Sequence, residues 1–290
     1  MAEESKLKKR EILELHKQLR GQFEFDSLKI YFGNDYTTKN GILIRQPTLG
    51  EIIDVGEKVF YENLNIFISN PTTFRLPLWN MGIDWCRITD FELFCILYQN
   101  INSDVCKLFL PECPISEYKL FTEKVDEDTE DVVLYHQETN SIIRNIDYLE
   151  ISQYLRTMFN IFPKVEYAKG KSTREAIIWE DEQNARRKDD KKVKSTLQPL
   201  VSACLNHPGF KYKKSELKDV GICEFMDSVN RLQVYENTVA LLRGSMSGFV
   251  DTSKISKDNF NFMRDLSTED DSKKYSGKEK DAFNRLTGSN

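Results

Sequence analysis

The sequence is poor in the residues from which most catalytic and metal sites are built. It contains three histidines, His16, His136 and His207, and they lie far apart along the chain. Neither a G-x-S-x-G nucleophile turn nor an H-E-x-x-H zinc motif is present. We therefore predict that the protein is not an enzyme, and we assign no catalytic, cofactor-binding or metal-binding residues. Catalytic groups that converge from distant positions would leave no such motif, so an enzyme remains an alternative.

Closely spaced cysteines are also missing. Zinc knuckles and thiol redox motifs need two thiolates on one tight turn, and no C-x2–4-C pair occurs. Most of the cysteines lie in apolar stretches such as "ELFCILY" and "VSACL", which predicts small buried thiols in a reducing compartment. The six are Cys86, Cys95, Cys106, Cys113, Cys204 and Cys223.

The chain has neither a long apolar run nor an excess of basic charge. No stretch approaches the roughly 20 apolar residues that span a bilayer, and the charged N-terminal segment has no apolar signal core. The net charge of −5 argues against general attraction to nucleic acid. With 40% hydrophobic residues, the composition predicts a globular protein of the cytosol that binds neither membranes nor nucleic acid.

Two stretches predict β-hairpins. Leu28, Ile30 and Phe32 alternate with other residues, and "GILI" follows the turn signal Asn40-Gly41, so we expect two short strands that end at Pro47. A second hairpin is expected around residues 138–141. Between them the acidic run "EKVDEDTED" at 123–131 lacks the regular oxygen spacing and the glycine of a calcium loop, and we interpret it as a solvated loop.

Capping patterns predict helices after Thr48 and Thr89. Each threonine is followed three residues later by a glutamate, Glu51 or Glu92, as in a capping box. The first helix carries an apolar stripe to residue 67, and Gly56 within it indicates close approach of a neighbouring element. The second, "FELFCILY", is apolar all round and predicts a central helix.

Two tryptophans and one aspartate receive structural interpretations. Trp79 and Trp85 flank a turn and could grip a ligand, but we favour anchoring in the core. Asp147 is expected to cap the helix that follows it.

The stretch "GKST", Gly170 to Thr173, has the form of the end of a phosphate-binding loop. That motif requires a glycine at position 165, where this chain has Val165. Ser172 and Glu175 together form S-x-x-E directly before "AIIW", so we predict a helix cap with Ser172 at the N-cap, and no nucleotide site.

Helices alone are expected beyond residue 195. A short helix should stop at Pro208-Gly209, and a long one should end at Gly244. Cys204 and His207 share one helical face, but two ligands make a weak metal site, and we interpret His207 as part of a helix terminus. The buried stripe predicted for the long helix is Ile222, Phe225, Met226, Val229, Leu232, Tyr235, Val239 and Leu242.

These patterns predict an α+β fold that is mostly helical, with two short β-hairpins in an N-terminal domain and a helical C-terminal domain. The expected division is an N-terminal amphipathic helix at 1–21, an α+β domain at 22–170, a charged helix or linker at 171–194, a helical domain at 195–266 and a disordered tail at 267–290.

Several phrases of the sequence resemble a known group of proteins. They are "LKIYFGNDYTTKNGILIRQPTLGEIIDVGEKVFY", "LWNMGIDWCRITDFELFCILY" and the stretch from "LVSACLNHPGFKYKK" to "SGFVDTSKI". They are similar to proteins encoded among the tail morphogenesis genes of tailed bacteriophages and prophages of Gram-positive hosts, among them tail assembly chaperones. The likeness covers roughly residues 28–265 and lies in hydrophobic phrasing.

The resemblance implies a non-enzymatic tail assembly chaperone in the cytoplasm of the infected bacterial host. Its implied partner is a phage tail protein such as the tape-measure protein, and an oligomer is left open. Two alternatives are a structural component of the virion tail, connector or baseplate, and a phage enzyme or host-modulating factor with an unrecognised site.

Overall fold

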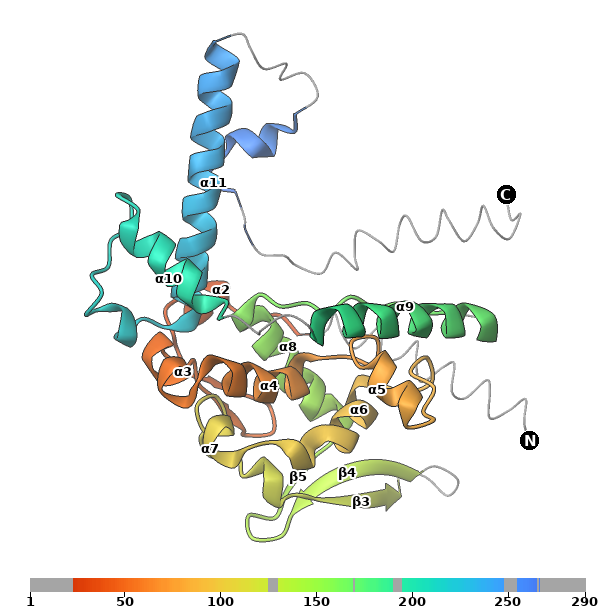
Figure 1. The fold of residues 1–290 in the computed structure, drawn as a ribbon. Helices are drawn as coiled ribbons and strands as arrows, with labels where there is room; N and C mark the ends of the chain where they lie inside the picture. The colour runs from red at the N-terminus through yellow and green to blue at the C-terminus, as the bar shows by residue number, and fades with distance from the viewer. Residues whose placement is uncertain are drawn as a thin grey trace.

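The computed structural model describes residues 23–124, 130–168, 170–189, 195–247, 255–264 and 266 (Figure 1). Most of this part is helical, and two small antiparallel sheets complete it, which confirms the predicted α+β class. The expected helix at 1–21 and the tail at 267–290 lie outside the described residues. The α-helices are α2 (Ser27–Tyr31), α3 (Leu49–Val55), α4 (Glu57–Ile68), α5 (Arg75–Asn80), α6 (Asp90–Leu97), α7 (Ser103–Cys106), α8 (Asn145–Phe159), α9 (Lys171–Asp189), α10 (Leu197–Asn206) and α11 (Ile222–Met246).

Five strands and four short 3-10 helices accompany them in the described ranges. The strands are β1 (Tyr36–Thr37), β2 (Leu43–Ile44), β3 (Lys119–Lys124), β4 (Glu130–His136) and β5 (Ser141–Ile143). The 3-10 helices are η1 (Tyr98–Asn100), η2 (Ile115–Glu117), η3 (Leu217–Asp219) and η5 (Lys257–Phe260).

The first hairpin forms at the predicted turn, but it is shorter than expected. Strands β1 and β2 pair antiparallel with Tyr36 opposite Ile44, and Gly41 in the turn adopts a φ of 81°. Glycine has no Cβ and adopts a positive φ without a steric penalty, which explains why glycine occupies position 41. Asn40-Gly41 therefore gives the position of the hairpin correctly.

The strand expected at residues 28–32 is wrong, because this segment is helix α2. The side chain of Asp26 accepts hydrogen bonds from the backbone amides of Leu28 (3.0 Å) and Lys29 (3.3 Å), which starts the helix. Of the alternating apolar residues, Ile30 is buried whereas Leu28 and Phe32 are exposed. The alternation therefore did not mark a face of a sheet.

The second hairpin is part of a three-stranded sheet in the order β3-β4-β5. The turn predicted at 138–141 joins β4 to β5, and His136 lies opposite Ser141. Strand β3 was not predicted, and it pairs with β4 so that Leu120 lies opposite Leu134. The ends of the acidic run, Glu123 and Asp131, are thus paired strand residues and not loop residues, while positions 125–129 lie outside the described part.

The capping box at Thr48 is present, but the helix after it is interrupted. Thr48 Oγ1 accepts from the Glu51 amide at 3.2 Å, and the Glu51 carboxylate accepts from the Thr48 amide at 2.8 Å. Gly56, with a φ of 97°, ends α3 and precedes α4. A Cβ at Gly56 would meet nothing within 4 Å, so the expected close approach at this residue is wrong.

A close approach occurs instead at Gly50, where a Cβ would lie 2.7 Å from the carbonyl oxygen of Lys218. This contact brings α3 against η3. Next to it, the Leu49 amide donates to Val220 O (2.9 Å) and the Ile222 amide donates to Pro47 O (3.0 Å). The start of α11 is therefore fixed to the start of α3 by backbone hydrogen bonds.

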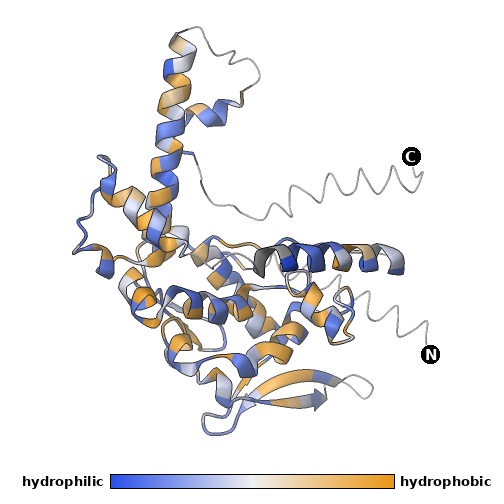
Figure 2. Ribbon diagram, viewed as in Figure 1, coloured by the Kyte–Doolittle hydropathy of each residue, from blue (hydrophilic) through white to orange (hydrophobic). Residues whose placement is uncertain are grey.

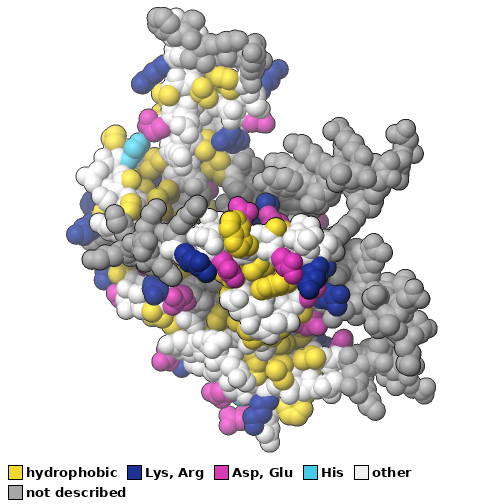
Figure 3. All heavy atoms as spheres, turned by 45° about the vertical axis from the view of Figure 1, so that its right-hand side comes forward, with side chains coloured by type: hydrophobic (Ala, Val, Ile, Leu, Met, Phe, Trp, Pro, Cys, Tyr) yellow, Lys and Arg dark blue, Asp and Glu magenta, His cyan; other side chains and the backbone are white. Residues whose placement is uncertain are grey.

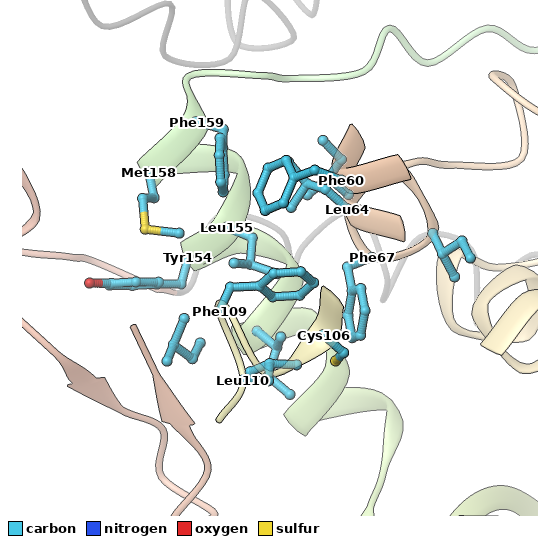
Figure 4. Packing of buried hydrophobic residues seen from close by; sticks show 14 of the residues in the cluster. Phe60, Leu64, Phe67, Cys106, Phe109, Leu110, Tyr154, Leu155, Met158 and Phe159 are labelled. Carbon is cyan, nitrogen blue, oxygen red and sulfur yellow. The ribbon is translucent and has the colours of Figure 1, made fainter. Parts of the chain in front are cut away.

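Helices α4, α6 and α8 contribute to the main hydrophobic core. Figure 4 shows the part of it where residues of α4 and α8 meet Cys106, Phe109 and Leu110. Phe109 lies between Phe60 and Phe67 with ring centroids 6.1 and 5.3 Å away, both in edge-to-face geometry. The same core includes Leu197, Cys204, Ile222 and Phe225 from the C-terminal helices. The predicted domain boundary at 171–194 stays a prediction, and residues from both sides of it share this core.

A smaller core lies under α9 and contains Leu78, Trp85, Leu93, Ala168 and Ile178. Trp85 is buried and Trp79 packs against the cluster, so both tryptophans have the anchoring role that we favoured. All six cysteines are free; Cys106, Cys113 and Cys204 are buried and the other three are half-buried.

An ion pair is buried between α6 and α8. Arg156 Nη2 lies 3.1 Å from Asp90 Oδ2, and the side chains are 6% and 2% exposed. The guanidinium also donates to the carbonyl oxygens of Ile68 (2.7 Å) and Ser69 (2.9 Å), at the C-terminal end of α4. Asp90 follows Thr89, whose capping box with Glu92 is present as predicted.

Helix α8 begins two residues before the predicted cap. The Asp147 carboxylate accepts from the Arg144 amide at 2.8 Å, but Asp147 is the third residue of the helix and not its N-cap. It satisfies a free amide from inside the first turn, where a negative charge also favours the helix dipole.

Helix α11 projects from the body of the molecule (Figure 1). Its 25 residues span about 37 Å at 1.5 Å per residue. It continues to Met246, so the predicted end at Gly244 is too early, whereas α10 ends at Asn206 before Pro208-Gly209, as predicted. No helix in the ranges described is long and apolar enough to cross a bilayer.

Candidate functional site

The predicted buried stripe of α11 is buried only at its base. Ile222 and Phe225 are fully buried, and Met226, Val229 and Leu232 pack against the core. Further along, Tyr235 and Leu242 are exposed. Hydrophobic residues nevertheless continue along the projecting part of the helix (Figure 2). This half of α11 therefore offers apolar surface that the core does not use.

An open groove of about 630 Å³ lies beside this surface. Its walls come from α2, from the segment between α10 and η3, from α11 and from the residues after η5. Aromatic and aliphatic side chains make up most of the lining, with charged groups between them. The lining residues are Tyr31, His207, Gly209, Phe210, Lys211, Tyr212, Asp227, Ser228, Arg231, Leu232, Tyr235, Phe262 and Met263.

Hydrogen bonds hold the wall formed by residues 262–263 against α11. Arg231 Nη1 donates to the carbonyl oxygens of Phe262 and Arg264, each at 2.8 Å. About two turns further along α11, Thr238 Oγ1 donates to Asn259 O at 3.1 Å. The rings of Tyr235 and Phe262 meet edge to face with centroids 5.7 Å apart. A single arginine thus fixes the backbone of this wall, and an aromatic pair covers it.

The opposite wall follows the Pro208-Gly209 turn. The Gly209 amide donates to His207 Nδ1 at 3.0 Å, and His207 Nε2 lies 3.2 Å from the Glu236 carboxylate of α11. Both ring nitrogens of His207 therefore have partners. Beyond the turn, Phe210 and Tyr212 pack edge to face at 5.7 Å.

Charges of both signs surround the apolar floor. Asp227 and Arg231 lie one helical turn apart, 3.9 Å from each other. Burial raises the pKa of the Tyr31 phenol, and the nearby Asp227 and Glu224 raise it further. A hydrogen bond with Glu224 and, next, burial raise the pKa of Tyr212 to about 12. Both phenols are neutral at pH 7; the Tyr212 hydroxyl already donates to Glu224, whereas the Tyr31 hydroxyl can donate a hydrogen bond to a ligand.

The groove is suited to binding apolar side chains. Its volume lies in the usual range of about 300–1,000 Å³ for ligand sites, and it is lined mainly by apolar groups with a few polar ones between them. Figure 3 shows hydrophobic and charged side chains alternating over the projecting part of the molecule. The exposed groups at its mouth include Tyr235, Phe262 and Met263, the last 75% exposed.

The "GKST" stretch is a helix start, but not in the predicted way. Helix α9 begins at Lys171, so Ser172 is a residue of its first turn, and the N-cap prediction for Ser172 is wrong. The Lys171 side chain is exposed and lies 3.8 Å from Glu175. Arg174 holds this turn in place, since it donates to Ala168 O at 2.9 Å and pairs with Asp84.

Of the pair Cys204 and His207, Cys204 is buried and His207 belongs to the wall of the groove. The groups that could hold a metal ion in the described ranges are Glu117, His136 and Glu138, which the sequence did not indicate. Strands β3 and β4 carry the chain from Glu117 to His136, so the spacing of these two residues in the sequence did not indicate a metal site.

Comparisons with protein-family models, with curated proteins and with solved structures gave no match to this chain.

Proposed function

We propose that this protein is a non-enzymatic phage tail assembly chaperone, which holds a helical segment of the tape-measure protein in the groove beside α11. It would act in the cytoplasm of the infected bacterial host, before the tube subunits cover that partner. The observation that carries the proposal is the open, largely aromatic groove along the exposed half of α11. The resemblance of the sequence to tail assembly proteins supplies the identity of the partner.

The groove fits an amphipathic helix better than an extended peptide. An extended peptide adds to the edge of a sheet, whereas the walls here are helices and turns. A bound helix places apolar residues at i, i+3, i+4 and i+7, and α11 offers an apolar surface with the same spacing at Leu232 and Tyr235. The tape-measure protein is long and helical, and it aggregates while it is uncovered, so such a groove would keep it soluble.

The charges at the rim suit a partner helix with a mixed polar face. Asp227, Arg231 and Lys211 line the groove, and Glu236 pairs with His207 in its wall, so either sign on the partner finds an opposite charge. Exposed pairs of this kind contribute up to about 1 kcal/mol each, so the apolar contacts must provide most of the affinity. We therefore place the energetic centre of the site at Tyr235, Phe262 and Met263.

Co-expression with the cognate tape-measure protein tests the proposal. The full chain should raise the soluble yield of that protein, and the two should purify together. The double variant Tyr235→Ser, Met263→Ser should lose both effects while it remains folded, because both side chains are exposed. Met246→Ser is the matched control, since Met246 is 85% exposed at the far end of α11 and does not line the groove.

The absence of both solubilisation and co-purification for the unchanged protein would refute the chaperone function. Mass spectrometry of purified virions separates it from a structural role. A chaperone should be absent from the particles, whereas a tail, connector or baseplate component would be present at a fixed copy number.

A further inference from the structure

Three side chains with metal-binding groups meet at the three-stranded sheet, at the opposite end of the molecule from α11 (Figure 1). Glu117 is the last residue of η2, His136 is the last residue of β4, and Glu138 lies in the turn before β5. One ligand atom from each side chain lies within 4.8 Å of the others. His136 is 4% exposed, and both glutamates reach the solvent.

The imidazole of His136 is held in one orientation. Its ring stacks on Tyr118, with centroids 5.1 Å apart and planes 27° apart. Its Nδ1 lies 2.7 Å from Thr139 Oγ1. These contacts direct Nε2 towards the Glu117 carboxylate. Metal-binding histidines commonly have the other ring nitrogen fixed by a partner of this kind.

The distance between His136 Nε2 and Glu117 Oε2 is 3.4 Å. A usual N–H···O hydrogen bond is shorter, about 2.7–3.2 Å. Two ligands of one tetrahedral zinc ion, each about 2.0–2.1 Å from it, are about 3.3 Å apart. The two side chains are thus spaced as ligands of a common ion. A carboxylate oxygen of Glu138 lies within 4.8 Å of the other two ligand atoms, and the side chain is exposed.

A chain of hydroxyl groups allows His136 to offer the required lone pair. Thr139 Oγ1 lies 2.7 Å from Ser141 Oγ, which lies 2.6 Å from the Tyr118 hydroxyl. Each hydroxyl can donate and accept, so the chain can run in either direction without movement of heavy atoms. In one tautomer Nδ1 accepts from the Thr139 amide at 3.4 Å; in the other, Nδ1–H donates to Thr139 Oγ1, and Nε2 is unprotonated and faces the Glu117 carboxylate.

We propose that Glu117, His136 and Glu138 bind a divalent transition-metal ion, with Zn²⁺ as the probe of choice, and that water completes its coordination. One imidazole and two carboxylates are a common ligand chemistry for zinc. The bound ion would tie η2 to the turn between β4 and β5, which are joined here by side-chain contacts. The site is separate from the groove, so it adds a property to the protein that the proposed function does not require.

Titration calorimetry of the metal-free full chain with Zn²⁺ tests this site. Saturable binding of one ion per chain is expected, together with a rise in the melting temperature. Glu117→Gln and Glu138→Gln should each weaken binding by more than about tenfold, the scale of loss seen when even an outer partner of a metal ligand is removed. Glu112→Gln, a change at an exposed glutamate five residues before Glu117 in the sequence, should bind as the unchanged protein does.

Two further measurements separate this site from the cysteines and from the other histidines. Co²⁺ in place of Zn²⁺ should show no intense thiolate charge-transfer bands, and Zn²⁺ should shift the ¹⁵N resonances of His136 while leaving those of His207 unchanged. Absence of binding at millimolar Zn²⁺, unchanged affinity in both glutamine variants, or thiolate bands with Co²⁺ would each overturn the proposal.

Discussion

Replacement of Arg156 by methionine should be among the most destabilising single changes in this protein. The guanidinium is almost fully buried and makes three contacts: the carboxylate of Asp90 at 3.1 Å and the carbonyl oxygens of Ile68 and Ser69 at 2.7 and 2.9 Å. Methionine has a similar length but no donor. The variant would therefore leave a buried carboxylate and two carbonyl groups with fewer partners.

The expected loss is about 3–5 kcal/mol, as measured when one partner of a buried ion pair is removed. For a chain of this size each kcal/mol lowers the melting temperature by about 2–4 °C, so a decrease of roughly 10 °C should be seen. Asp90→Asn should cost less, because the amide still accepts a hydrogen bond from Arg156 and the two carbonyl contacts remain.

Chemical unfolding of the full chain, followed by circular dichroism, measures these values. Arg87→Met is the matched control. Arg87 is 65% exposed and pairs with Asp84 at 3.1 Å, so its removal should cost at most about 1 kcal/mol. A loss below about 1 kcal/mol for Arg156→Met would show that the pair is hydrated, and the reasoning from burial would be wrong.

Three further predictions concern other parts of the chain. Burial alone would raise the pKa of Glu57, but hydrogen bonds from Ser195, Thr196 and Leu197 at the start of α10 hold it below its usual value of 4.5. The stabilisation by this carboxylate is present above pH 4.5 and is lost as the pH falls through the lower pKa of the folded state. Glu57→Gln should therefore make the free energy of unfolding less dependent on pH in the acid range. Glu62→Gln should leave that dependence unchanged. ATP or GTP with magnesium should leave the melting temperature unchanged. A nucleotide that did bind, present at 100 times its dissociation constant, would add about 2.7 kcal/mol to the free energy of unfolding. Lys171→Ala should not change the melting temperature either. Limited proteolysis should cut first at residues 186–194 and after residue 265; early cuts within 89–100 and a protected linker would contradict the domain boundary.

Sequence patterns were reliable where the chemistry is local. Thr48 with Glu51 and Thr89 with Glu92 form capping boxes, because the groups that bond are three residues apart and the helix itself brings them together. The Asn40-Gly41 turn is similarly local.

Sequence patterns gave wrong or missing secondary-structure predictions at three other places. The alternation at residues 28–32 predicted a strand, yet Asp26 starts a helix there. Strand β3 went unpredicted because its sequence, "KLFTEK", gains its structure from pairing with β4. The S-x-x-E pattern at Ser172 matches a capping box, but α9 starts at Lys171, two residues earlier than that pattern requires.

The groove could not be predicted from the sequence, because its walls come from four separated segments. Tyr31, Phe210, Tyr235 and Phe262 are brought together only by the fold. The one signal available was the length of the apolar stripe on α11. A stripe that continues beyond the surface available to cover it must end in exposed apolar residues, and Tyr235 and Leu242 are such residues.

The two halves of α11 have different roles that depend on each other. The base is fixed by the buried Ile222 and Phe225 and by the hydrogen bond from the Ile222 amide to Pro47 O. Tyr235 lies ten residues beyond Phe225, about 15 Å along the same helix. Helices that lack tertiary contacts are only marginally stable in water, so the exposed half needs the buried base and the 255–264 segment that Arg231 and Thr238 hold. These contacts are present without a partner, so a bound helix need not order the wall against which it packs. The affinity is therefore not reduced by the conformational entropy that ordering this wall would cost.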